Sequence, residues 1–177
     1  MKKIIIIGAS NSTTSINRSL ANYAASLLQN TENVVLDLND YEMPIYSPER
    51  ESGDGVPQAA QNFVQLIESA DGLIVSLAEH NGSYSAAFKN VLDWTSRHKQ
   101  KLWSEKAMLL LSTSPGARGG ATVLAAAEGL FPRLGAKVVA TFSLGSFYDN
   151  FNQESGISDS ALQSQLESAV AKFSEAL

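Results

Sequence analysis

The sequence predicts an α/β protein in which helices cover both faces of a parallel β-sheet. Two observations carry this prediction. Apolar segments of strand length alternate along the chain with segments whose apolar residues recur at helical spacing. The first segment, residues 4–7, consists of four isoleucines, and such a β-branched run is typical of a strand buried on both faces. Because parallel strands need crossover connections, the intervening helices are expected to pack on the sheet.

Five strands and five helices follow from these patterns. The predicted strands are residues 4–7, 34–38, 73–77, 107–111 and 138–142. The apolar faces of the predicted helices lie within residues 16–28, 60–67, 84–92, 123–134 and 162–173. The second strand has one wetter face, which favours a place at the edge of the sheet. Residues 40–56 contain prolines and glycines without periodicity and predict a long loop, and residues 143–156 predict a second irregular stretch.

The composition indicates one ordinary globular domain spanning residues 1–177. A net charge of −5, with no stripe of Lys and Arg, argues against a nucleic-acid partner. The chain has no cysteine, so disulfides and thiolate chemistry are excluded, and its two histidines are too few for a metal site. The N-terminal apolar run is too short for a signal peptide or a membrane span. We therefore expect a cytoplasmic protein that has no membrane partner.

Three polar loops follow predicted strands. In sheets of this kind, ligands bind beyond the carboxyl ends of the strands, where the strand order reverses. Loop one (residues 8–17), loop two (residues 78–84) and loop three (residues 112–120) are all rich in Gly, Ser, Thr and Asn. We expect these loops to form the binding site.

Loop one predicts a phosphate-binding site. The helix that begins near Ser15 offers main-chain N–H groups and its positive dipole end. The side-chain donors are Ser10, Ser12, Thr13, Thr14, Ser15 and Asn17. The loop contains no Lys or Arg and neither a GxxxxGKS nor a GxGxxG pattern, which favours the single terminal phosphate of a mononucleotide. The alternative is that these residues only cap the helix and form a turn.

Loops two and three are less specific. His80 fits either a general acid or an ordinary loop histidine, and the role of Glu79 is equally open. The glycines of loop three would let the main chain approach a flat ligand closely. Asp93 is expected to be solvated or to cap a helix, and Trp94 and Trp103 are expected to be core or interface residues.

Taken together, the three loops resemble the NADPH-dependent FMN reductase family. The likeness is carried by IIIIGASNSTTSINRSLA, EHNGSYSAAFKNVLDW and STSPGARGGATVL, which occur in the family's order and spacing. The second segment is the most specific, because it is similar to the family's Glu-Tyr-Asn-Gly-Ser-x-x-x-x-Leu-Lys-Asn-x-x-Asp-Trp stretch. The resemblance implies a flavodoxin-like three-layer α/β/α sandwich with a five-stranded parallel sheet in the order 2-1-3-4-5.

The resemblance also implies an FMN site. Loop one would hold the phosphate, partly through the main-chain amide of Ile16, and loops two and three would border the isoalloxazine ring. The implied cofactor-binding residues are Ser10, Ser12, Ser15, Ile16, Asn17, Ala78, Glu79, His80, Asn81, Gly82, Ser112, Thr113, Ser114, Gly116, Arg118, Gly119 and Gly120. The chain departs from the family pattern at Ala78 and His80, where the family has Pro and Tyr. It also lacks the family's loop-one arginine; Arg118 could either substitute for it or simply lie on the surface.

By this resemblance the protein is an NAD(P)H-dependent FMN oxidoreductase. Hydride would pass from NAD(P)H to FMN N5, and a quinone, flavin, azo or metal-ion acceptor would then be reduced in ping-pong order. The cofactor carries this chemistry, so we expect no catalytic side chain. The alternatives are a flavodoxin-like electron carrier and a non-catalytic FMN-binding or protein-interaction module.

The resemblance further implies a homodimer or homotetramer. Phe147, Tyr148 and Phe151 lie in the second irregular stretch. They could serve a subunit interface, shield the flavin or pack on the core of their own chain.

Overall fold

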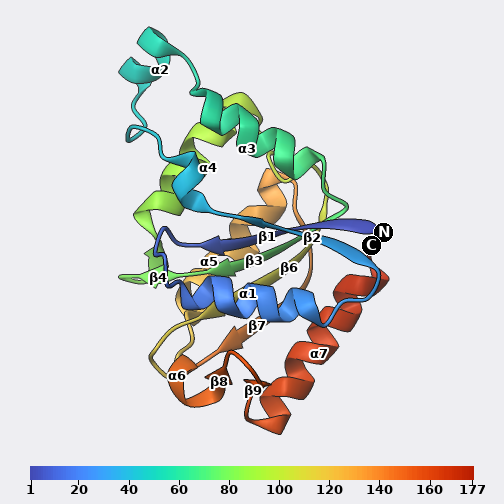
Figure 1. Ribbon diagram of the computed structural model, residues 1–177. Coiled ribbons are helices and arrows are strands. Elements are labelled where there is room, and N and C mark those ends of the chain that lie inside the picture. Colours follow the sequence, from blue (N-terminus) through green and yellow to red (C-terminus); the bar gives the residue numbers. More distant parts are fainter.

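The central sheet of the protein has five parallel strands in the order β2-β1-β3-β6-β7 (Figure 1). The computed structural model describes all residues from 1 to 177. The strands are β1 (Lys2–Ala9), β2 (Thr31–Leu36), β3 (Gly72–Leu77), β6 (Ala107–Thr113) and β7 (Lys137–Leu144). The predicted strand order is confirmed, since β6 and β7 are the fourth and fifth predicted strands. The second strand lies at an edge of the sheet, as expected.

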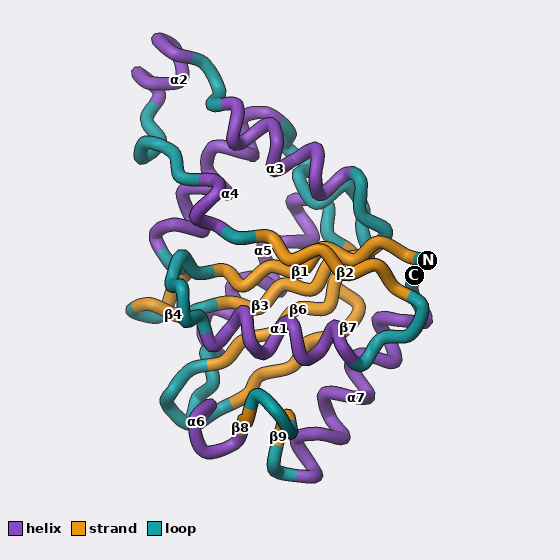
Figure 2. Tube along the Cα trace, viewed as in Figure 1, coloured by secondary structure: helices purple, strands orange, loops and turns teal.

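Helices form a layer on each face of the sheet (Figure 2). On one face lie α1 (Ile16–Ser26) and α7 (Ser160–Glu175), whose apolar residues belong to one buried cluster. On the other face lie α3 (Gln58–Glu68), α4 (Ala86–His98) and α5 (Ala121–Leu130), with a second cluster between them and the sheet. The three-layer α/β/α prediction is therefore confirmed. No helix combines the length and the apolar content that crossing a membrane requires.

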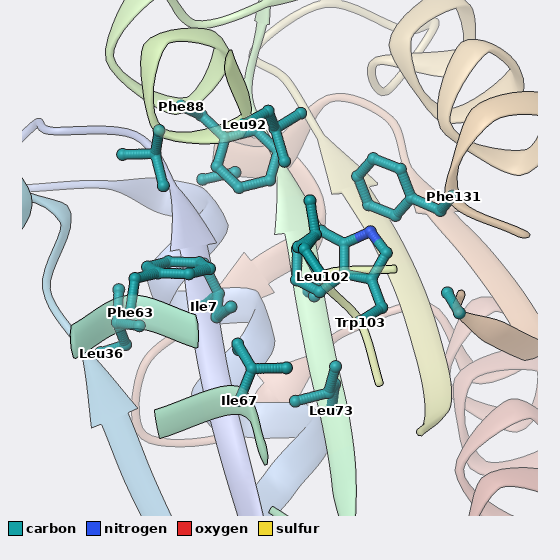
Figure 3. Close-up of a cluster of buried hydrophobic side chains, with 14 of the residues drawn as sticks. Ile7, Leu36, Phe63, Ile67, Leu73, Phe88, Leu92, Leu102, Trp103 and Phe131 are labelled. Carbon is teal, nitrogen blue, oxygen red and sulfur yellow. The ribbon is translucent and has the colours of Figure 1, made fainter. Parts of the chain in front are cut away.

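Large aromatic side chains fill the core under α3, α4 and α5. Figure 3 shows Phe63, Trp103 and Phe131 gathered over the sheet. The ring centroids of Trp103 and Phe131 are 4.9 Å apart, and those of Trp103 and Phe63 are 6.4 Å apart. Trp94 and Trp103 are 1% and 0% exposed, so of the two roles expected for them, core or interface, both are core residues.

The segment predicted as a long loop, residues 40–56, contains the end of a short helix, η1 (Leu38–Tyr41), and the whole of another, α2 (Pro48–Asp54). The hydroxyl of Ser47 caps α2, and Pro48 fits its first turn. No residue of α2 is buried, so the helix leaves no apolar periodicity in the sequence. The second strand ends at Leu36 and not at residue 38, because the Asp37 carboxylate accepts the Asn39 N–H and starts η1.

The second irregular stretch contains α6 (Phe147–Asn150) and a hairpin of β8 (Phe151–Asn152) and β9 (Gly156–Ile157). Phe147 is buried, and its ring stacks on that of Phe151 with centroids 4.8 Å apart. Of the roles considered for these aromatics, packing on the core of their own chain therefore applies to both. Tyr148 differs from them because its side chain is 72% exposed.

Candidate functional site

Loops one, two and three meet around a hollow of about 220 Å³ beyond the carboxyl ends of β1, β3 and β6. A larger hollow of about 890 Å³ lies along the open edge of β7, between α5 and α7. The smaller hollow is the better candidate, because polar groups from three strand ends converge there. β4, which contributes Glu79 and His80 to the lining, lies on the opposite side of the molecule from the two chain termini (Figure 1).

The structure brings most of the predicted site residues to this hollow. Its lining includes Ser10, Ser12, Ser15, Ile16, Asn17, Ala78, Glu79, His80, Thr113 and Ser114. The predicted residues outside the lining are Asn81, Gly82, Ser112, Gly116, Arg118, Gly119 and Gly120. Thr14, Pro115 and Tyr148 also line the hollow. Thr14 was expected as a phosphate donor, and Pro115 lies in loop three, which was expected to border the site, although it was not among the named cofactor-binding residues.

Loop one presents free donors at the start of α1. The Ser15 hydroxyl caps the helix by accepting the Arg18 N–H at 3.2 Å, which leaves its own hydrogen free to donate. The main-chain N–H groups of Ile16 and Asn17 have no partner within the protein. These groups and the nearby hydroxyls make the loop a site for an anion at a helix N-terminus.

The cation nearest to loop one lies in the first turn of α1. Arg18 forms an ion pair with Asp37 at 3.1 Å and donates a second hydrogen bond to the Thr13 carbonyl. The Asn39 N–H groups and, to a smaller extent, the Arg18 charge hold the pKa of the Asp37 carboxyl below its ordinary value of 3.8. A lowered pKa stabilises the folded state above about pH 3.8, and this stabilisation is lost as the pH falls through the lower, folded-state value. Because its guanidinium bonds both Asp37 and the Thr13 carbonyl, Arg18 stabilises the conformation of loop one.

Loop two is a hairpin formed by β4 (Glu79–His80) and β5 (Ser83–Tyr84). Asn81 and Gly82 make its turn with φ angles of 52° and 73°, the left-handed conformation that tight hairpins require. The Glu79 carboxylate accepts the Val123 N–H at 2.9 Å, in the first turn of α5. Glu79 is therefore a cap of α5 that joins loop two to the helix following loop three, and His80 stays exposed at the rim of the hollow.

Loop three is packed against the chain that follows β7. A Cβ on Gly145 would lie 2.3 Å from the Ala117 carbonyl oxygen, so only glycine allows this approach of the two main chains. The Ser146 N–H donates to Gly116, and the Phe147 N–H donates to Ser114. These contacts place Tyr148 at the hollow.

Two remaining candidates of the sequence, Arg118 and Asp93, have local partners. The Arg118 guanidinium donates to the Thr122 hydroxyl at 3.0 Å, on the exposed start of α5. Asp93 pairs with Lys89 at 2.7 Å on the outer face of α4, so it is the solvated residue that was expected.

Replacing Glu79 by alanine is expected to lower the free energy of unfolding by about 1 kcal/mol, because an N-terminal N–H of α5 loses its acceptor. The amide oxygen of Glu79→Gln can still accept this bond, so we expect the glutamine variant to lose less. Urea denaturation of both variants checks this prediction. Equal losses would mean that the charge, and not the hydrogen bond, is what stabilises α5.

Comparisons with known proteins agree with this geometry. The family model described as NADPH-dependent FMN reductase matches residues 2–149. A 2-hydroxy-1,4-benzoquinone reductase of a Burkholderia species is 36% identical over 121 residues, which cover 67% of this chain and 64% of that relative, less than two thirds of its length.

Solved structures have the same fold. The flavoenzyme NAD(P)H:(acceptor) oxidoreductase of Paracoccus denitrificans matches with a TM-score of 0.79 at 22% identity, over 99% of this chain and 97% of that one. The apo form of an NADH:FMN oxidoreductase matches with a TM-score of 0.66 at 25% identity, over 100% of this chain and 90% of that one.

Proposed function

The chain belongs to the NADPH-dependent FMN reductase family, and from this premise we propose that it uses NAD(P)H and bound FMN to reduce a small-molecule acceptor. Membership confirms the resemblance seen in the sequence and the enzyme class that it implied. FMN is the cofactor of this family, and NAD(P)H is its co-substrate. When bound, FMN would supply the chemistry by accepting hydride at N5 and then giving two electrons to a quinone, flavin, azo or metal-ion acceptor in ping-pong order.

The donors of loop one are the observation that supports this proposal best. The free N–H groups of Ile16 and Asn17 and the hydroxyls of Ser10, Ser12 and Ser15 line one hollow. Such a set suits a terminal phosphate held without a lysine or arginine, since a helix N-terminus contributes a partial positive charge. The phosphate of FMN fits this set of groups.

The size of the hollow supports an open site. At about 220 Å³ it is smaller than the roughly 300–1,000 Å³ that usually enclose a whole cofactor. We infer that it takes the phosphate end and that the ring system extends across the rim near His80 and Tyr148. An exposed ring suits a reductase whose two substrates must reach it in turn.

We also propose a homodimer or homotetramer, as the resemblance implied, and a cytoplasmic location, as the sequence patterns predicted. Both stay predictions. Sedimentation of the FMN-loaded protein would test the oligomeric state.

Anaerobic reduction tests the function. The purified protein is expected to bind FMN, and NADH or NADPH is expected to bleach the visible flavin absorbance, which an added quinone then restores. Bleaching by dithionite but by neither nicotinamide would indicate an electron carrier. A protein that binds no FMN would contradict both readings.

Replacing Tyr148 by alanine is expected to lower kcat/KM for a planar quinone by about threefold to tenfold, because an exposed aromatic ring at the rim can stack on a flat acceptor. Tyr148→Phe keeps the ring and is expected to retain most of this activity. Ferricyanide, which is not planar, serves as the control acceptor. An equal loss with both acceptors would mean that Tyr148 acts on the cofactor and does not select the acceptor.

A further inference from the structure

The side chain of Asn17 forms three hydrogen bonds inside the protein. Its amide oxygen accepts the Ser76 hydroxyl at 2.7 Å and the Thr113 N–H at 3.0 Å. Its amide nitrogen donates to the Thr113 carbonyl at 3.1 Å. The orientation of the amide is fixed, because the Thr113 N–H can only donate and its carbonyl can only accept. Asn17 is 3% exposed, so this network lies under the surface of the hollow.

The position of Thr113 explains why these bonds are needed. The register of β3 against β6 ends with Leu77 opposite Ser112, so Thr113 extends beyond its neighbouring strand. Its N–H and carbonyl on that side would be buried without partners, since Thr113 is only 1% exposed. A buried main-chain group without a hydrogen bond costs about 1–3 kcal/mol. The Asn17 amide supplies both missing bonds.

We propose that Asn17 is a positioning residue, whose side chain joins α1 to the ends of β3 and β6, and not a phosphate ligand. The bridge fixes Thr113, the last residue of β6, relative to the start of α1. Thr113 belongs to loop three and Asn17 is the last residue of loop one, so the bridge sets the distance between two walls of the hollow. The contribution of Asn17 to an anion is then its main-chain N–H. The identity of the ligand rests on the proposed function, whereas the hydrogen-bonded bridge between Asn17 and Thr113 does not depend on it.

Ser76 separates the two roles of Asn17. Its side chain is fully buried, it does not line the hollow, and its hydroxyl donates to Asn17. If the Asn17 side chain bound the phosphate directly, FMN binding would not need Ser76. If Asn17 positions the loops, binding weakens without Ser76, because the Asn17 amide loses one of the hydrogen bonds that orient it.

The test compares three variants by FMN fluorescence titration and by hydrogen exchange of the Thr113 amide in the FMN-free protein. Ser76→Ala is expected to weaken FMN binding about threefold to tenfold, the effect of one lost hydrogen bond. Asn17→Ala is expected to weaken it more than tenfold and to accelerate Thr113 exchange. Asn33→Ala removes a hydrogen bond from a side-chain amide to the Ala25 carbonyl in another part of the fold. It is expected to change neither FMN affinity nor Thr113 exchange.

The proposal is wrong if Ser76→Ala binds FMN as the wild type does and Thr113 exchange is unchanged in both site variants. Should Asn17→Ala fail to fold, Ser76→Ala alone decides between the two roles. If the wild type binds no FMN, the proposed function fails, and Thr113 exchange still decides whether the bridge exists.

Discussion

Replacing Trp103 by alanine is expected to lower the free energy of unfolding by about 3–5 kcal/mol, the usual cost of removing a large aromatic ring from a packed core. The indole is 0% exposed and contacts the rings of Phe63 and Phe131. Phe131 in turn stacks on Tyr84 of loop two, with centroids 6.2 Å apart. Urea denaturation, followed by circular dichroism, measures the loss.

Trp103→Phe provides the matched control. The indole N–H has no hydrogen-bond partner although it is buried, so phenylalanine removes an unpaired polar group together with part of the ring. We expect this variant to lose only about 1–2 kcal/mol. If Trp103→Ala and Trp103→Phe lowered the free energy of unfolding equally, the indole N–H would have to form a hydrogen bond in the folded protein.

Replacing Gly8 by alanine is expected to weaken FMN binding at least tenfold and to lower the free energy of unfolding by about 1–3 kcal/mol. A Cβ at this position would lie 2.6 Å from the Arg18 Cβ and 2.7 Å from the Arg18 Cα and main-chain nitrogen. Side-chain rotation cannot relieve a clash with main chain, so α1 must move away from β1. That movement displaces the N–H groups of Ile16 and Asn17. Fluorescence titration with FMN and urea denaturation measure the two effects.

Gly129→Ala is the control for this variant. A Cβ on Gly129, within α5, would meet no atom within 4 Å. Alanine is therefore expected to stabilise the protein by about 0.5–1 kcal/mol through helix propensity, with FMN affinity unchanged. If Gly8→Ala bound FMN as tightly as Gly129→Ala does, the close approach of α1 to β1 would not be what positions the phosphate donors.

Local chemistry explains why much of the fold could be predicted. Residues 4–7 favour a buried strand, because four adjacent isoleucines are β-branched and leave no polar face. Ser15 was expected near the start of a helix, and its hydroxyl caps α1. The helix α2 was missed for a related reason. It buries nothing, so its sequence carries caps but no apolar stripe.

The roles of individual site residues depend on partners far away in the chain. Glu79 caps a helix 44 residues later, and Asn17 bonds to residues 59 and 96 positions away. Nothing in the residues next to Glu79 or Asn17 specifies these partners. Tyr148 is a similar case, because two main-chain bonds between loop three and the chain after β7 bring it to the hollow.

The sequence by itself determined the parallel sheet, its helices and the three polar loops at the strand ends, because burial and capping act within a few residues. The tertiary structure alone decided that the Asn17 amide bonds to the ends of β3 and β6, that Glu79 caps α5 and that Arg18 bonds to the main chain of loop one. These contacts form only when the sheet brings loops from distant parts of the chain together, since a side chain bonds to whichever group the packing places within reach.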